Sequence, residues 1–348
     1  MAGCIVSTEK LGFPYKCADP FLFCVYHRDV YPPSTQKLKR GNGADFDWSQ
    51  PYRMYHGTEL PGFPQHPHRG FETVTATLEG TIDHADSLGN AGRYGGGDLQ
   101  WMTAGAGVVH GEMFPIIHAD RNNTCRFFQI WLNLEKKNKM APPSYVMHWN
   151  EDIPRVRSAD GLATITVWAG EVESLCGLPP PLFSYGAQDS NEVAILHIAL
   201  LPGGSVVLPP ASRGTNRRLY WVEGTALSVG ALSVPDKCAM TLDPQVPAEV
   251  RNPTPNPNTD PNPAGSTGTI TELLLLQGRP IGEPVVQHGP FVMNTDAEIQ
   301  QAFADYRRTQ FGGWPWPQDA MSFPVDKPRF TLQGGKEDFP PPPRGPAV

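Results

Sequence analysis

The sequence predicts an all-β protein in which short strands form a sandwich or barrel. Of its 348 residues, 35 are Gly and 38 are Pro, whereas only 18% are charged. This balance suits short strands joined by many turns better than long surface helices. Hydrophobic residues make up 39% of the chain, enough for packed cores. The length exceeds one average domain, so we expect two.

The first half of the chain shows a strand-and-turn pattern. Residues 19–23 indicate a strand that enters a core, whereas residues 27–60 are polar and rich in Pro, Gly and Asp, which predicts a long excursion loop. The following strands are expected where β-branched or dense apolar runs are closed by Gly-rich turns: 71–79, 81–86, 99–102, 108–110 and 125–134. Such dense turns are typical of a sandwich or barrel.

A second β-rich region follows a linker at residues 136–143. Its expected strands are 163–169, 193–200, 206–208, 218–222 and 273–276. The tetrapeptide at 78–81 is echoed at 222–225, each time at the end of a strand pattern. The echo suggests that both halves have the same fold. Where a His-x-His would precede the second tetrapeptide, the chain has Thr-Asn-Arg at 215–217, which cannot ligate a metal in that way.

The remaining segments differ from this strand pattern. Residues 251–264 are too rich in Pro for a strand interior, which predicts an inserted surface loop. Residues 296–310 have the apolar spacing of one amphipathic helix, with Thr295 and Glu298 placed as a capping box. Four consecutive prolines at 340–343 indicate a tail.

Composition argues against several classes of function. The formal net charge of −7 argues against a protein that binds polyanions such as nucleic acid directly. Six cysteines form no CxxC pair, so disulfides and a zinc knot are not expected. The start lacks a signal-peptide pattern, and the apolar runs are too short to span a bilayer. We therefore expect a soluble, intracellular protein that does not enter a membrane.

The segment around His66 carries the clearest chemistry. His66 and His68 stand at i and i+2, so on an extended segment both side chains project from the same face. His110 and Glu112 repeat this spacing some forty residues later, and Glu72 lies just after the first pair. Two such pairs indicate one site built across two strands, able to surround a divalent metal.

The donor set leaves the metal and the chemistry open. Three imidazoles and one carboxylate, without sulfur, suit Fe(II), Mn(II), Ni(II), Cu(II) or Zn(II). Four protein ligands would leave two positions of an octahedral metal for water, oxygen or a bidentate substrate. A redox or hydrolytic enzyme fits this set, and so does a sensor whose metal changes charge. The other histidines lack such pairing, and we expect them to be structural: residues 27, 56, 84, 118, 148, 197 and 288.

Four blocks of sequence carry a family resemblance. HPHRGFETVTATLEG at 66–80, GGGDLQWMTAGAGVVHGEM at 95–113, LLLLQGRPIGEPVVQHGPFVMNT at 273–295 and the AEIQQAFADY helix at 297–306 resemble the pirin family of the cupin superfamily. The resemblance implies two tandem cupin β-barrels with a C-terminal helix. We expect an N-terminal cupin at 1–140, a degenerate cupin without metal at 141–330, interrupted by the 251–264 loop, and a Pro-rich tail at 331–348.

The resemblance also implies a ligand set. The family motif gives a single iron, most simply Fe(II), held by His66, His68, His110 and Glu112. The general cupin pattern would place its carboxylate at Glu72 instead. We prefer Glu112 on the family motif and keep Glu72 as a residue near the site that could act in acid–base catalysis.

Two classes of function follow from the resemblance. Some pirin-like proteins are quercetin 2,3-dioxygenases, in which a carboxylate near the metal could take the proton of a flavonol; here that carboxylate would be Glu112 or Glu72. Others are iron-binding co-regulators of transcription, a role that the acidic balance of this chain would direct through a protein partner. We expect a monomer in the cytoplasm. The native metal, the physiological substrate and import into a nucleus are left open, as is the role of the stretches 27–60 and 251–264.

Overall fold

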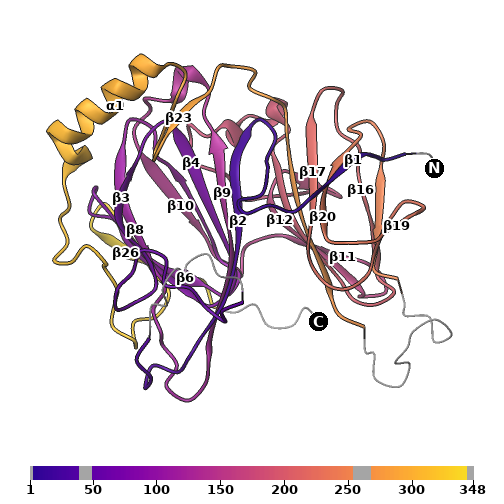
Figure 1. Ribbon diagram of the computed structural model, residues 1–348, viewed down its shortest axis with the longest axis horizontal. Helices are drawn as coiled ribbons and strands as arrows, with labels where there is room; N and C mark the ends of the chain where they lie inside the picture. Colours follow the sequence, from indigo (N-terminus) through magenta and orange to yellow (C-terminus); the bar gives the residue numbers. More distant parts are fainter. Residues whose placement is uncertain (1–2, 39–48, 254–267, 343–348) are drawn as a thin grey trace. The chain divides into compact units, whose positions relative to one another are not determined.

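The computed structural model describes residues 3–38, 49–253 and 268–342. Within them the chain folds mainly as β-strands and has one long helix, α1 (Asp296–Thr309) (Figure 1). The chain forms two compact units. The first, which we call the N-terminal unit, comprises Val25–Asp152, Pro181–Ser184 and Glu283–Val348. The second, the C-terminal unit, comprises Met1–Cys24, Ile153–Pro180 and Tyr185–Gly282.

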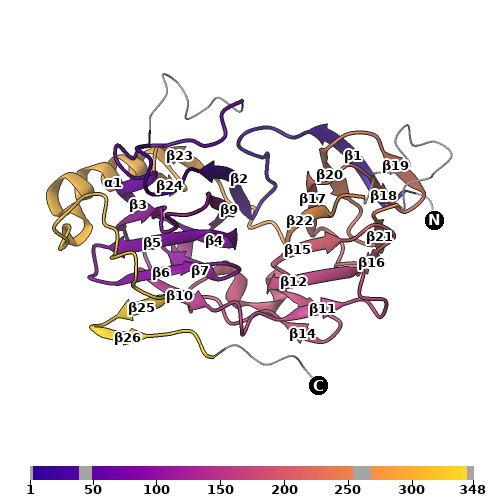
Figure 2. The ribbon, with the colours of Figure 1, turned by 90° about the horizontal axis from the view of Figure 1, so that it is seen from below.

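The N-terminal unit is built from two antiparallel sheets. One has the strand order β10-β7-β4-β9-β2, with β2 (Phe21–Tyr31), β4 (Phe71–Glu79), β7 (Leu99–Thr103), β9 (Asn123–Asn133) and β10 (Ser144–His148). The other has the order β26-β25-β6-β5-β8-β3, with β3 (Gly62–His68), β5 (Thr81–Asp86), β6 (Ala91–Gly95), β8 (Val108–Met113), β25 (Phe330–Gln333) and β26 (Lys336–Asp338). In Figure 2, β5, β6, β25 and β26 can be followed side by side.

Shorter elements complete the N-terminal unit. They are the hairpin β23 (Val286–His288) and β24 (Phe291–Met293), and the 3-10 turns η2 (Lys136–Asn138) and η5 (Gln310–Gly312). Helix α1 packs Ile299 and Ala302 against Val109 of β8 and Phe291 of β24. The helix and hairpin therefore cover the strand that carries His110.

The C-terminal unit repeats a two-sheet plan. Its larger sheet has the order β1-β20-β17-β22-β15-β12-β11, with β1 (Ile5–Lys10), β11 (Arg155–Arg157), β12 (Ala163–Ala169), β15 (Ala194–Leu200), β17 (Asn216–Glu223), β20 (Cys238–Leu242) and β22 (Thr271–Gly278). The smaller has the order β16-β21-β18-β19, with β16 (Ser205–Leu208), β18 (Leu227–Val229), β19 (Leu232–Val234) and β21 (Ala248–Arg251). A hairpin of β13 (Glu171–Val172) and β14 (Leu175–Cys176) and the turns η3 (Tyr185–Ala187) and η4 (Asp189–Asn191) complete it.

An arginine occupies the interior position where the C-terminal unit lacks a His-x-His. Arg217 is 1% exposed, and its guanidinium donates to Gln277 Oε1 (2.9 Å) and to the backbone oxygen of Pro209 (2.7 Å). It also reaches the carbonyls of Asp243 and Val246, both at 3.2 Å. A buried guanidinium that uses its donors in this way is a structural group. The absence of a metal from this unit stays a prediction.

The predicted fold class is confirmed. Strands β4, β5 and β12 begin and end at the predicted residues, and α1 carries the predicted capping box of Thr295 and Glu298. Among the described residues, no helix combines the length and the apolar character needed to cross a membrane.

The first strand and the last two strands of the chain do not follow the expected domain ranges 1–140, 141–330 and 331–348. Strand β1 pairs with β20 of the C-terminal unit, although it lies at the start of the range expected for the N-terminal cupin. Strand β25 pairs with β6, and β26 pairs with β25, so part of the expected tail is sheet. Local pattern could not reveal the pairing of β1 with β20 or of β25 with β6, because each joins segments more than two hundred residues apart, whereas β25 and β26 form a local hairpin.

Two predicted loops fall only partly within the described residues. The excursion predicted for 27–60 begins later, because β2 continues to Tyr31 and Asp29 is fully buried. Residues 39–48 within it lie outside the described residues, as do residues 254–264 of the predicted 251–264 loop. Strand β21 ends at Arg251, the residue at which that loop is predicted to begin.

His27 of β2 couples the stability of the fold to pH. Its Nδ1 lies 2.6 Å from the hydroxyl of Tyr55, and its ring stacks on Phe127 at 4.2 Å. Burial, with a smaller contribution from the charge of Arg53, lowers the pKa of His27 to about 3. The unfolded chain therefore takes up a proton near pH 6.5 that the folded protein takes up only near pH 3. This contribution to stability is complete above pH 6.5 and is lost as the pH falls toward 3.

We expect the variant His27→Phe to have a weaker pH dependence of unfolding. A phenyl ring keeps the stacking on Phe127 but cannot be protonated. Each pH unit below about 6.5 costs the wild type about 1.4 kcal/mol through His27, so between about pH 7 and about pH 5 it should lose roughly 2 kcal/mol more than the variant. Urea unfolding of the metal-free proteins at both pH values measures this difference. Parallel losses in the two proteins would contradict it.

Candidate metal centre

Strands β3 and β8 bring the predicted histidines together. His66 is the direct cross-strand partner of His110, so the two side chains project from the same face of the sheet. His68 follows His66 at i+2 on that face. The ring centroids lie 4.5 Å apart for His66 and His110, 4.7 Å for His66 and His68, and 5.0 Å for His68 and His110. One ligand atom from each ring lies within 4.8 Å of the other two, close enough for one metal ion.

Two of the three imidazoles have their tautomer fixed by the backbone. His66 Nδ1 lies 2.9 Å from the oxygen of Pro64, and His68 Nδ1 lies 3.4 Å from the oxygen of Pro290. A carbonyl oxygen can only accept, so each Nδ1 carries the proton and each Nε2 offers its lone pair. This is the usual arrangement behind a metal-ligating histidine.

The three rings are held neutral. Burial lowers the pKa of His66 to about 4 and lowers the pKa values of His68 and His110 well below their usual range. The nearby imidazoles act in the same direction on His68 and His110. Neither nitrogen of His110 has a hydrogen-bond partner within the described part of the chain, although the ring is fully buried. Unpaired buried nitrogens on neutral imidazoles fit a site that a metal ion completes.

The turn after His68 is fixed to the rest of the N-terminal unit. Gly70 has a φ of +86°, and a Cβ there would collide with the carbonyl of Val292, so only glycine fits. Arg69 Nε donates to the oxygen of Ala106 (2.6 Å), and its Nη1 donates to Asp305 Oδ2 of α1 (2.9 Å). The helix and the Gly turn therefore set the end of the strand that carries two of the ligands.

Glu112 lies on the same face as His110, but its carboxylate is held by other groups. Its Oε1 lies 2.9 Å from Thr75 Oγ1 and 3.2 Å from the hydroxyl of Tyr94, and its Oε2 accepts from Gln129 Nε2 at 3.3 Å. Burial raises the pKa of Glu112, an effect that these hydrogen bonds and His84 oppose. The histidines thus converge on one point, and Glu112 stands beside them as a buried acid.

Glu72 is not brought to the histidines. Phe71 and Thr75 of β4 contact His68 and Glu112, and Glu72 belongs to the alternate face of that strand. There its Oε1 accepts from Trp101 Nε1 (3.2 Å) and Thr103 Oγ1 (2.7 Å), and its Oε2 accepts from Ser184 Oγ (2.8 Å). The carboxylate therefore has a full set of structural partners away from the cluster.

The structure adds His84 to the surroundings of the cluster. His84 of β5 is the direct partner of Glu112 across the β5–β8 ladder, and its ring lies 5.5 Å from that of His110. We expected His84 to be structural. A signal was present in the sequence, because His84 and Asp86 form another pair of ligand types at i and i+2.

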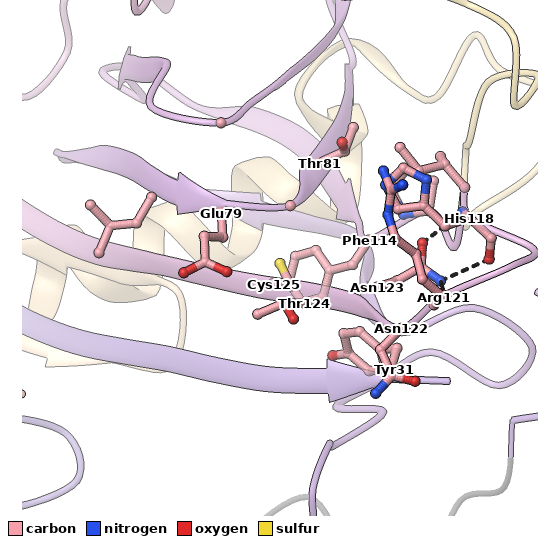
Figure 3. A pocket seen from close by; sticks show the side chains of 15 residues that line it. Tyr31, Glu79, Thr81, Phe114, His118, Arg121, Asn122, Asn123, Thr124 and Cys125 are labelled. Carbon is pink, nitrogen blue, oxygen red and sulfur yellow. Dashed lines mark hydrogen bonds between the residues drawn. The ribbon is translucent and has the colours of Figure 1, made fainter. Parts of the chain in front are cut away.

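A separate cavity of about 510 Å³ lies at another part of the N-terminal unit. Figure 3 shows Glu79, Thr81, His118 and Arg121 around it, with Phe114 and Cys125 among the residues that line it. Arg121 Nη2 lies 3.2 Å from His118 Nε2. None of the cluster histidines lines this cavity, so it is distinct from the metal centre.

Comparison with known proteins decides the family. The family model Pirin matches residues 19–132, and the model of the Pirin C-terminal cupin domain matches residues 195–312. The chain belongs to the pirin family. Among the relatives of this pirin-family chain, a pirin-like protein of Solanum lycopersicum is 38% identical over 286 residues, covering 81% of this chain and 85% of the relative. Pirin of Homo sapiens is 35% identical over 261 residues, covering 74% and 80%.

A solved structure supports the same assignment. The crystal structure of quercetin 2,3-dioxygenase from Acinetobacter baumannii matches this pirin-family chain with a TM-score of 0.67 and 27% identity, covering 89% of this chain and 96% of that one. The predicted membership of the pirin family and the two-cupin architecture are confirmed. The cluster of three histidines fits a divalent metal, and its donor atoms do not decide which.

Proposed function

We propose that this pirin-family protein holds one divalent metal, Fe(II), at His66, His68, His110 and Glu112, and that it is a dioxygenase of the quercetin 2,3-dioxygenase type. The observation that carries the proposal is the convergence of three neutral imidazoles, two of them buried and one half-buried, beside a buried acid. The match to a quercetin 2,3-dioxygenase over most of both chains supports the reaction class. Mn(II), Ni(II), Cu(II) and Zn(II) are the alternative ions for this donor set.

The histidines and Glu112 would have different roles at this centre. A divalent metal bound here would supply Lewis-acid and redox chemistry to a flavonol and O₂. His66 and His68 would ligate through Nε2, because their Nδ1 protons are used by the backbone. As a carboxylate, Glu112 adds an oxygen donor to the set, and its raised pKa also favours taking a proton from a substrate hydroxyl.

The hydrogen bonds of Glu112 suit such a proton transfer. The single hydroxyl proton of Thr75 can go either to Glu112 Oε1 at 2.9 Å or to Gln129 Oε1 at 2.8 Å. When Glu112 is charged, Thr75 donates to it. When Glu112 is protonated, it can donate to Thr75, which then donates to Gln129. Both protonation states are therefore satisfied without movement of the strands.

Aromatic side chains beside the cluster favour an aromatic substrate. The ring of Trp131 lies 5.4 Å from that of His68, and the ring of Phe63 lies 6.2 Å from that of His66. Both rings are partly exposed. A flat flavonol-like molecule at the cluster would find apolar ring surface beside it.

The proposal is tested by measuring quercetin turnover in the wild type and in a variant that lacks the proposed base, Glu112. Purified protein loaded with Fe(II) should consume O₂ and bleach the absorption band of quercetin. The variant Glu112→Gln should lower the rate per bound metal by about 100-fold or more, within the usual range for general acid–base catalysis. The matched control Glu72→Gln, on the opposite face of β4, should keep the rate per bound metal.

Three outcomes would change the proposal. A loss of turnover in Glu72→Gln with metal retained would move the base to Glu72. Equal rates in Glu112→Gln and the wild type would remove the assigned role of Glu112. No turnover with any of the five metals would leave the alternative function, a non-enzymatic, iron-dependent co-regulator of transcription that acts through protein partners.

A further inference from the structure

Among the residues that the structure describes, the four buried ring nitrogens of His84 and His110 have no hydrogen-bond partner. Both side chains are fully buried. Buried polar atoms in folded proteins are nearly always paired, so four such atoms on two adjacent rings call for an explanation. A metal at the cluster would use one nitrogen of His110 and would leave the other three unexplained.

The other two ligands show what His110 lacks. His66 and His68 each direct their second ring nitrogen at a backbone carbonyl. A metal-ligating histidine almost always has such an acceptor, because the acceptor fixes the tautomer and the orientation of the ring. His110 has none in the part of the chain that the structure describes. The imidazole of His84 is the neighbouring group that could supply one, with its ring centroid 5.5 Å away.

Tyr145 leaves the nitrogens of His84 available to His110 and Asp86. Tyr145 packs against the His84 ring at 5.2 Å, but its hydroxyl is bonded to the oxygen of Ala91 (3.0 Å) and to Thr331 Oγ1 (2.7 Å). On the other side, Asp86 Oδ2 lies 3.6 Å from His84 Nε2. Across the β5–β8 ladder, Asp86 is the direct partner of His110, so these side chains share one face.

The carboxylate of Asp86 is firmly held. Its Oδ1 accepts the backbone N–H groups of Leu88 (2.8 Å) and Asn90 (2.9 Å), and its Oδ2 accepts from Asn90 Nδ2 (3.0 Å). The turn after β5 thus places a fixed anion behind His84. A carboxylate in this position can only accept a hydrogen bond, so it would select the tautomer of His84 that carries its proton on Nε2.

We propose that His84 is a positioning residue for the metal centre: its Nδ1 accepts the N–H of His110, and its Nε2–H is donated to Asp86. Metal binding to His110 supplies the reason for the two rings to join and for the 3.6 Å gap between His84 Nε2 and Asp86 Oδ2 to close. The inference rests on a metal at the histidine cluster, as proposed above. It does not depend on which reaction the metal supports.

Metal affinity tests the role of His84. Wild-type protein should bind Co(II), measured by competition with a chromophoric chelator. His84→Phe should bind it about 10–100-fold more weakly, as is usual when the outer partner of a ligand is removed. His84→Gln should recover part of the affinity, because the side-chain carbonyl of Gln can accept from His110. Tyr145→Phe is the matched control: it keeps the ring that packs on His84 and should leave the affinity unchanged.

A spectroscopic measurement on the unaltered protein keeps the test independent of variant folding. In Zn(II)-loaded, ¹⁵N-histidine-labelled protein, an N–H···N bond should produce a ¹⁵N–¹⁵N coupling between His110 and His84. Wild-type affinity in His84→Phe, or absence of this coupling in the loaded protein, would overturn the role of His84. Absence of Co(II) and Zn(II) binding by the wild type would instead overturn the metal centre itself.

Discussion

His110→Ala and His66→Ala should each abolish stoichiometric metal binding while the protein stays folded. Each change removes one of three convergent imidazoles and leaves two, so the loss should exceed the roughly 10–100-fold effect of removing an outer partner. The fold should tolerate both changes because His66 gives up one bond, to the oxygen of Pro64, and the His110 nitrogens make no hydrogen bond to any described residue. The cavity left by the ring should cost about 2–5 kcal/mol, the range seen when a large core side chain is replaced by Ala.

Elemental analysis after gel filtration measures the outcome. The control is His288→Ala, also in the N-terminal unit, whose exposed imidazole lies at β23 with its ring 5.4 Å from that of Phe303. It should keep the metal content of the wild type. Circular dichroism would confirm that the variants remain folded. Metal that survives both His66→Ala and His110→Ala would show that the site lies elsewhere in the chain.

The i and i+2 spacing was enough to find the cluster from the sequence. It placed His66 with His68 and His110 with Glu112, and the structure brings the three imidazoles together. The sequence could not give the register that pairs His66 with His110, because that register includes an irregularity between Phe63 and His66.

The choice of carboxylate depended on which face of β4 is turned to the cluster. Glu72 directly follows Phe71 on the strand, and alternation sends the two side chains to opposite faces. Phe71 meets His68, so Glu72 cannot. All but the last two residues of β4 are buried on either face, which removes the polar and apolar alternation from which the orientation could have been inferred. The family motif, rather than local pattern, favoured Glu112.

The C-terminal segment was harder to predict because one buried charge holds it in place. Arg93 of β6 is 3% exposed and forms a bidentate pair with Asp83 of β5, at 2.7 Å and 2.8 Å. Its Nη1 also donates to the oxygens of Pro324 (2.7 Å) and Lys327 (2.9 Å), and its Nη2 to that of Phe323 (2.9 Å). In the sequence Arg93 is a lone charge between Gly92 and Tyr94, and nothing local assigns it partners more than two hundred residues away.

Arg93→Met should destabilise the N-terminal unit by about 3–5 kcal/mol, the usual cost of leaving one partner of a buried ion pair alone. Asp83 would keep bonds from Ser322 Oγ and the Phe323 N–H but would lose its charged partner in a fully buried position. The carbonyls of the 323–327 segment would lose their donors at the same time. We therefore expect β25 to separate from β6 before the rest of the unit unfolds.

Hydrogen exchange at residues 322–338, together with urea unfolding, measures both effects. The matched control is Lys327→Met in the same segment, which removes a surface ion pair with Glu337 at 2.7 Å. That pair is partly exposed and should contribute no more than about 1 kcal/mol. Rapid exchange in Arg93→Met with slow exchange in Lys327→Met would show that burial of the guanidinium, rather than charge pairing in general, fixes the segment. Equal exchange in the two variants would contradict this account, and the strand pairing of β25 with β6 would then have to hold the segment without Arg93.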